Sequence, residues 1–199
     1  MKKKVLLFAI FSVMSSLAFA DSCKPEAFLK DGVNFDALQQ CKSALRQCPR
    51  VGPFPDQHCV SEQMKSNNSC AQFANLSSLT GNNASFTNVN KVKNFTLVQN
   101  YAPADGQSRY FAIDSQGCLI SATIEPQKID PAFAQDNSKR TMITVALTKP
   151  IIHQDPSGQS VMTVRLAVRE CLACKTLKQT TANFMFDSSG KYQGVKLQD

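Results

Sequence analysis

The stretch from residue 161 to residue 186 constrains the fold most, because two long alternating runs flank a short turn. Apolar side chains occupy every second position of both runs: Met162, Val164, Leu166 and Val168, then Ala182, Phe184 and Phe186. This alternation is typical of an antiparallel strand pair with one packed face and one face in water. Between the runs lies Cys171-Leu172-Ala173-Cys174, the only C-x-x-C motif of the chain. The stretch therefore predicts a β-hairpin whose tip carries two cysteines.

Asp…Gly segments divide the rest of the C-terminal part into similar runs. They are Asp105-Gly106, Asp114 to Gly117, Asp155 to Gly158 and Asp187 to Gly190. In such turns Asp starts the turn and Gly supplies the positive φ. We expect strands at 92–101, 108–113, 118–125, 140–152, 161–171, 177–186 and 192–197, and one helical turn at 131–134. Thr144, Thr163, Arg165 and Arg169 are expected to point outward, with Ile143, Val145 and Leu147 sharing the packed face.

The N-terminal part has helical periodicity instead. Asn34 is a candidate N-cap, and apolar residues follow at three- and four-residue steps: Phe35, Leu38, Cys41, Leu45 and Cys48. A second helical segment covers 59–76, with an expected interruption at Asn67-Asn68-Ser69. We therefore divide the chain into a cysteine-rich helical region at 21–80, a polar linker at 81–91 and an antiparallel β region at 92–199. The helical and β regions are expected to form one folded unit.

These elements predict an α+β fold. N-terminal disulfide-rich helices would cover the apolar face of one curved antiparallel sheet of about six to seven strands. A small β-barrel with a helical appendage is the alternative. A helix wrapped by a curved sheet resembles the architecture of cystatin-like and NTF2-like proteins, but no sequence motif is shared with them.

The first twenty residues have the pattern of a secretory signal peptide. Lys2 to Lys4 are followed by an apolar run and by the small-x-small site Ala18-Phe19-Ala20. We expect export to the bacterial periplasm or the medium, with no membrane span after cleavage. The chain carries a formal charge of +7, and three of the lysines lie in the leader, which leaves +4. Scattered charge of this size does not favour nucleic-acid binding, which needs a clustered basic surface.

All eight cysteines follow the leader: Cys23, Cys41, Cys48, Cys59, Cys70, Cys118, Cys171 and Cys174. An even number in an exported protein predicts a disulfide framework. Five precede residue 80 and three follow it, so complete pairing requires an odd number of bonds between the two parts. Cys41 and Cys48 are seven residues apart, whereas Cys59 and Cys70 are eleven apart, which argues against a helical hairpin bridged by both pairs.

Cys171 and Cys174 are a candidate redox pair, because a C-x-x-C motif can hold a reactive thiolate. Such thiolates are usually stabilised by a helix N-terminus, whereas both flanks here are expected to be strands. A disulfide that fastens the hairpin is therefore the preferred interpretation. No hydrolase, zinc-protease, P-loop or dinucleotide motif occurs in the sequence, and we predict no metal or cofactor.

A group of basic residues around this hairpin is the other candidate site. Arg165 and Arg169 are expected on the outer strand face, with Lys175 and Lys178 flanking the turn, so that the four form a candidate surface for an acidic partner. The preferred function is a non-enzymatic exported module that binds an unidentified protein partner. Two alternatives remain: a thiol–disulfide oxidoreductase or chaperone that uses Cys171 and Cys174, and a cystatin-like protease inhibitor.

Overall fold

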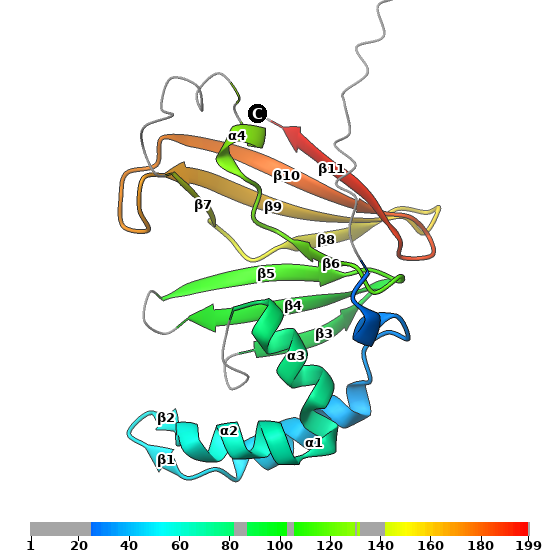
Figure 1. Ribbon diagram of the computed structural model, residues 1–199. Helices are drawn as coiled ribbons and strands as arrows, with labels where there is room; N and C mark the ends of the chain where they lie inside the picture. The colour runs from blue at the N-terminus through cyan, green and yellow to red at the C-terminus, as the bar shows by residue number, and fades with distance from the viewer. Residues whose placement is uncertain (1–24, 82–86, 103–105, 130, 132–141, 199) are drawn as a thin grey trace, which may run out of the picture.

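The computed structural model describes residues 25–81, 87–102, 106–129, 131 and 142–198. These residues form three stacked layers: a layer of helices, a middle sheet and an outer sheet (Figure 1). The expected leader and Cys23 lie outside the described residues, and so does most of the helical turn expected at 131–134. In the described part, no helix is both long enough and apolar enough to cross a membrane.

The helical layer contains three α-helices and two short 3-10 helices. In chain order they are η1 (Ala27–Leu29), α1 (Phe35–Arg46), α2 (Gln57–Ser66), η2 (Asn68–Cys70) and α3 (Ala71–Leu79). The N-cap prediction is confirmed, since the Asn34 side chain accepts a hydrogen bond from the Ala37 N–H at 3.0 Å. The predicted interruption is also confirmed, because Asn67 has extended dihedral angles between α2 and η2. A small hairpin of β1 (Arg50–Val51) and β2 (Phe54–Pro55) joins α1 to α2.

Two disulfides bridge these helices, which makes the sequence-based argument against a doubly bridged hairpin wrong. Cys41 bonds to Cys70, and Cys48 bonds to Cys59. The two spacings can be compared as helical rises only if each pair of cysteines lies along one straight helix. The break at Asn67 separates Cys59 from Cys70, so the eleven-residue spacing does not correspond to a helical rise.

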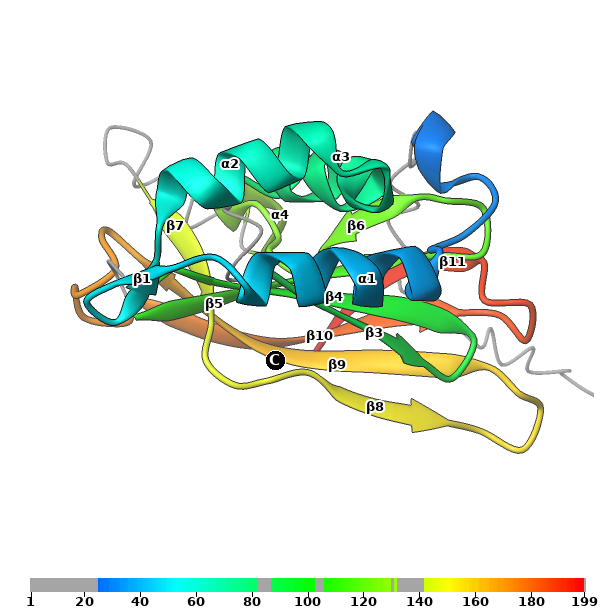
Figure 2. The same ribbon diagram turned by 90° about the horizontal axis from the view of Figure 1, so that it is seen from below.

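The middle sheet has the strand order β3-β4-β5-β6 and is antiparallel throughout. Its strands are β3 (Thr87–Val92), β4 (Phe95–Ala102), β5 (Gln107–Ile113) and β6 (Leu119–Ser121). β3 occupies part of the segment that the sequence suggested as a linker. One face packs against the helices through Val89, Val98 and Ile113. Figure 2 shows the molecule from the helical side, with the strands of the middle sheet behind α1. The other face turns Leu97 and Ala112 toward the outer sheet.

The outer sheet has the order β11-β10-β9-β7, and β8 also pairs with β9. Its strands are β7 (Ile143–Ala146), β8 (Ile151–Gln154), β9 (Ser160–Arg169), β10 (Lys178–Phe186) and β11 (Tyr192–Gln198). A short helix, α4 (Pro126–Ile129), follows the middle sheet in the chain. β9 and β10 pair antiparallel from Ser160 to Val168, so the predicted hairpin is confirmed.

The α+β class is confirmed, but the strands form two packed sheets where one curved sheet was expected. The apolar face of the β9–β10 hairpin packs on the middle sheet, not on the helices. Residues 95 to 98 of β4 are all buried, so this strand needs a layer on each face. Large twisted sheets commonly split into two packed sheets for the same reason.

The orientation of β7 is a second correction. Thr144 was expected to point outward, but it is opposite Val168, a core residue of β9. Because directly opposed residues of an antiparallel pair lie on one face, Thr144 lies on the packed face. Ile143 and Val145 lie opposite Arg169 and Ala167 on the other face and are half-buried.

Three of the Asp…Gly turns gather at one end of the sandwich, at the right of Figure 1. We call this the turn end: residues 114–117, 155–158 and 187–190. The buried Asp114 carboxylate accepts hydrogen bonds from the N–H groups of Gln116, Cys118 and Tyr192 at 2.8, 2.9 and 3.0 Å. Because Tyr192 belongs to the outer sheet, this carboxylate joins the two sheets.

Candidate binding site

The C-x-x-C motif is a disulfide at the tip of the β9–β10 hairpin. Cys171 and Cys174 are bonded, with their Cα atoms 4.9 Å apart. The Arg169 guanidinium donates to the Leu172 carbonyl at 2.9 Å and to the Thr176 hydroxyl at 3.1 Å. The tip is thus held by a covalent bond and by an arginine that spans it.

The surroundings of this disulfide are more typical of a structural disulfide than of a redox centre. The bond lies in a turn with strand on both sides, whereas reactive thiolates are stabilised at helix N-termini. Every cysteine in the described part of the chain is oxidised, Cys118 included.

The four basic residues of the candidate surface do not share one face. Arg165 and Arg169 lie on the outer face of β9, and Arg165 contacts the Gln179 side-chain oxygen at 3.4 Å. Lys175 is exposed in the hairpin tip. Lys178 lies opposite Val168 and therefore on the packed face of the sheet. The structure thus brings together Arg165 and Arg169, with Lys175 beyond the strand end.

A groove opens at the end of the sandwich opposite the turn end, between β5 and β7. Its volume is about 560 Å³. Fourteen residues line it: Gln107, Ser108, Arg109, Phe111, Ser121, Thr123, Ile124, Glu125, Pro126, Met142, Ile143, Thr144, Val145 and Leu172. Consecutive residues of β5 and of β7 contribute, and consecutive strand residues point to opposite faces. The groove therefore runs along the edges of these two strands.

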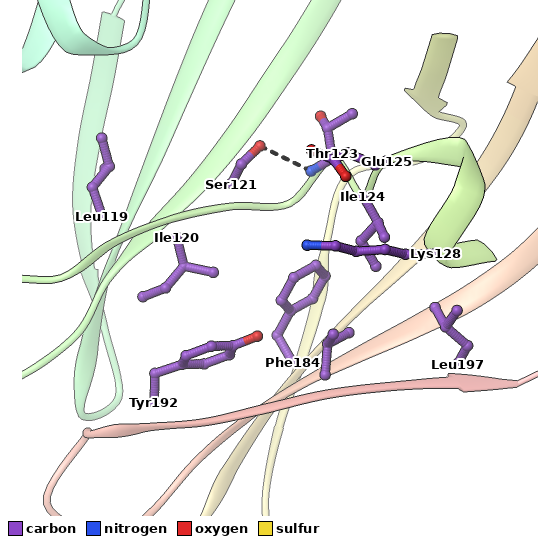
Figure 3. A pocket seen from close by; sticks show the side chains of 11 residues that line it. Leu119, Ile120, Ser121, Thr123, Ile124, Glu125, Lys128, Phe184, Tyr192 and Leu197 are labelled. Atoms are coloured by element: carbon purple, nitrogen blue, oxygen red, sulfur yellow. Dashed lines mark hydrogen bonds between the residues drawn. The ribbon is translucent and has the colours of Figure 1, made fainter. Parts of the chain in front are cut away.

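A smaller side pocket of about 210 Å³ lies between the β6–α4 segment and the strands β10 and β11. Figure 3 shows the Phe184 ring on its floor, with Leu197 and Ile120 at its sides. The Lys128 side chain reaches across it from α4, and the Tyr192 hydroxyl points toward it. The groove and the side pocket share Ser121, Thr123, Ile124 and Glu125, so this short segment separates them.

The sequence identified this site only in part. Leu172 of the C-x-x-C motif lines the groove, but the candidate residues Arg165, Arg169, Lys175 and Lys178 do not. The one sequence feature that indicated an irregular region beside the groove was the interruption of the strand pattern after Pro126. It carried no information on which strand edges would meet. Among the described residues, no cluster of His, Cys, Asp or Glu is arranged to hold a metal ion.

Comparison of the chain with protein-family models, with curated proteins and with solved structures finds no match.

Proposed function

We propose that this protein is an exported, disulfide-stabilised and non-enzymatic binding module, and that the groove between β5 and β7 is its binding site. The observation that carries the proposal is the groove itself. Its volume of about 560 Å³ lies within the range of roughly 300–1,000 Å³ that is typical of ligand sites. Apolar side chains from three segments line it, among them Phe111, Ile124 and Met142.

The charges at the rim suit a binding site. Arg109 and Glu125 both line the groove and are exposed, so the rim offers one charge of each sign around an apolar lining. A few polar groups around an apolar hollow are the usual composition of a site that binds and orients a ligand.

The case for export rests on the leader-like start of the sequence and on the disulfides. Cys41–Cys70 and Cys48–Cys59 both lie among core residues of the helical layer. Such bonds persist in oxidising compartments, which in bacteria means the periplasm or the medium. Mass spectrometry of the osmotic-shock fraction tests this, and we expect a chain that begins at Asp21. A chain that stays in the cytoplasm with residues 1–20 attached contradicts export.

Capture of partners by the mature protein, compared between two matched variants, tests the binding role. Thr123→Trp places a bulky ring at the exposed rim of the groove, whereas Gln179→Trp places the same ring on the exposed outer face of β10. We expect Thr123→Trp to lower the recovery of envelope or medium proteins by about tenfold, a loss of about 1.4 kcal/mol in binding. We expect Gln179→Trp to have no effect.

The reverse result would move the site to the outer face. Gln179 contacts Arg165, so loss of capture in Gln179→Trp and in Arg165→Glu would identify the Arg165–Arg169 surface as the docking site. No specific capture by the wild-type protein would contradict the binding role itself.

A further inference from the structure

Within the described residues, one edge of β7 is not paired with another strand, and Thr144 on that edge lines the groove. The Leu147 N–H donates to the Arg165 carbonyl at 2.8 Å, so this is a hydrogen-bonded pair of the β7–β9 ladder. Bonded and non-bonded pairs alternate in an antiparallel ladder. The main-chain groups of Ile143 and Val145 therefore point to β9, and those of Thr144 and Ala146 point away from it. Among the described strands, β9 is the one that pairs with β7.

On the other side of the groove, the first half of β5 has an edge that no described strand pairs with. β6 pairs with β5 only from Phe111 to Ile113, and the last bond on this edge runs from the Ala122 N–H to the Tyr110 carbonyl at 2.9 Å. The next main-chain groups that point the same way belong to Ser108, which lines the groove. Two strand edges with outward N–H and C=O groups thus border one hollow.

An independent observation at this place is the Thr144 hydroxyl. Thr144 is only 9% exposed, it lines the groove, and its Oγ1 is buried without a hydrogen-bond partner among the described residues. Buried hydroxyl groups in folded proteins are nearly always hydrogen-bonded. Because this oxygen is shielded from solvent, a ligand in the groove would bond to it after a rotation of the Thr144 side chain.

From these three features we propose that the occupant of the groove is an extended peptide segment of a partner protein, which adds as a strand to the free edge of β7. This inference rests on the proposed binding role and specifies the ligand. An extended backbone repeats its donors and acceptors every second residue, which matches the outward groups of Thr144 and Ala146. Its alternate side chains would pack on the apolar lining formed by Phe111, Ile124 and Met142.

The same sheet edge continues beyond the groove but is built differently there. β8 also pairs with β9, and Pro150 precedes it, so the edge is interrupted between β7 and β8. A proline and a charge, here Lys149 and Pro150, are common protections of exposed strand edges. The β7 segment beside the groove is therefore the better template for an added strand, and β8 offers a matched control.

The test begins with random heptapeptides displayed on phage and selected on the mature, oxidised protein. We expect enriched peptides with apolar residues at alternate positions. The strongest binder is then synthesised with and without N-methyl groups on alternate amides, which block strand pairing. Methylation at the positions that pair with β7 should weaken binding by at least about tenfold, while methylation of the other set of amides should have little effect.

Variants of the protein test whether the peptide pairs with the edge of β7 or with that of β8. Ala146→Pro removes an N–H that points away from β9, and proline is tolerated at edge positions of this kind. It should weaken peptide binding by about tenfold, whereas Ile152→Pro, the equivalent change on β8, should leave binding unchanged. Thr144→Val, which keeps the shape and removes the hydroxyl, should weaken binding by a few-fold. If Ala146→Pro lowers the melting temperature, the N-methyl series alone decides the question.

Several outcomes would overturn the inference. They are the absence of any enriched peptide, binding that is indifferent to backbone methylation, or binding lost in Ile152→Pro but not in Ala146→Pro. A concentration-dependent dimer that Ala146→Pro abolishes would instead identify a second copy of the chain as the occupant. If the partner capture described above still depends on Thr123 while these tests fail, the binding role stands and only the strand-addition mode is lost.

Discussion

The two ends of the β-sandwich are built from the same strands but are held in different ways. At the turn end, polar groups of three Asp…Gly turns bond across the two sheets: the Asn94 side chain donates to the carbonyls of Gly158 and Asp187, and the Ser115 N–H donates to the Gly190 carbonyl at 3.0 Å. At the groove end, the link of β9 to β10 is local, through the Cys171–Cys174 bond and Arg169. A groove lies beside β5 and β7 at that end.

The difference shows which end has room for a ligand. Hydrogen bonds between the sheets at the turn end use the Asp114 carboxylate and the Asn94 amide N–H groups, although the Asn94 Oδ1 is buried there without a partner among the described residues. At the groove end the edges of β5 and β7 direct main-chain groups toward the hollow, and the Thr144 hydroxyl is buried beside it without a hydrogen-bond partner among the described residues. The hydrogen bonds that join the sheets thus lie at one end and the proposed binding site lies at the other, which is a common division between scaffold and site.

The largest expected effect is removal of the carboxylate that joins the sheets at the turn end. Asp114→Ala leaves three N–H groups without their acceptor, and the group is buried, so we expect the free energy of unfolding to fall by about 4 kcal/mol. Urea denaturation followed by circular dichroism measures the change. Asp155→Ala is the control, because that carboxylate is exposed and its bonds stay within its own turn. Equal losses in the two variants would show that Asp114 does not join the sheets.

The next effect separates close packing from backbone conformation. Gly190 has φ of +83° and lies so close to Asn94 that an added Cβ would overlap the Asn94 carbonyl. Gly106 has φ of +66° at the groove end, with no atom within 4 Å of an added Cβ. We expect Gly190→Ala to destabilise by about 3 kcal/mol and Gly106→Ala by only about 1 kcal/mol. Thermal melts of the two variants measure this, and similar shifts would contradict a tightly packed turn end.

Removal of the hairpin disulfide should have a smaller effect. Cys171→Ser opens a loop closed by residues only three apart, so the chain-entropy model gives a loss of about 2 kcal/mol. Cys41→Ser opens a bond with a separation of 29 residues in the buried core and should cost about 3–4 kcal/mol. Both are read as melting temperatures under non-reducing conditions. If Cys171→Ser has the melting temperature of the wild type, this disulfide does not stabilise the fold.

The smallest effect concerns acid stability at the turn end. A hydrogen bond from the Ser189 hydroxyl lowers the pKa of Asp187 below its ordinary value of 3.8, and one from the Ser157 hydroxyl lowers the pKa of Asp155 in the same way. Because the folded pKa lies below the unfolded one, the stabilisation is present above about pH 4 and is lost as the pH falls through the folded pKa. Melting temperatures between about pH 5 and pH 2 should fall less steeply for Asp187→Asn than for the wild type. Ser189→Ala, which keeps the Asp187 carboxylate but removes the hydrogen bond that lowers its pKa most, should reduce the slope in the same direction.

Much of the local structure was predictable, because it depends on residues near one another in the chain. The alternation from Val161 to Phe186 predicted the β9–β10 hairpin, and Asn34 and Asn67 marked where helices begin and break. The positive φ of Gly117, Gly158 and Gly190 agrees with the predicted turns. Errors arose where a pattern has two geometric solutions: Thr144 occupies the packed face that periodicity assigned to Ile143 and Val145.

The groove could not be predicted, since its two walls belong to strands that are not hydrogen-bonded to each other. Ser108 and Thr144 are 36 positions apart in the sequence, and each looks like an ordinary strand residue. Nothing in either pattern indicates that its outward main-chain groups face a shared hollow. Leu172 was noted only for the cysteines beside it, and Ile143, Thr144 and Val145 were noted only as strand residues.

By itself the sequence determined the elements of this protein: the helical start, the turns, the strand alternation and an oxidised set of cysteines. These follow from short-range preferences of backbone and side chain. Only the tertiary structure decided that the strands divide into two sheets and that the middle sheet takes the helices. It also left the edges of β5 and β7 beside a hollow. A periodic pattern is compatible with more than one arrangement of the strands. Tertiary packing decides between these arrangements, because burial depends on which distant surfaces come into contact.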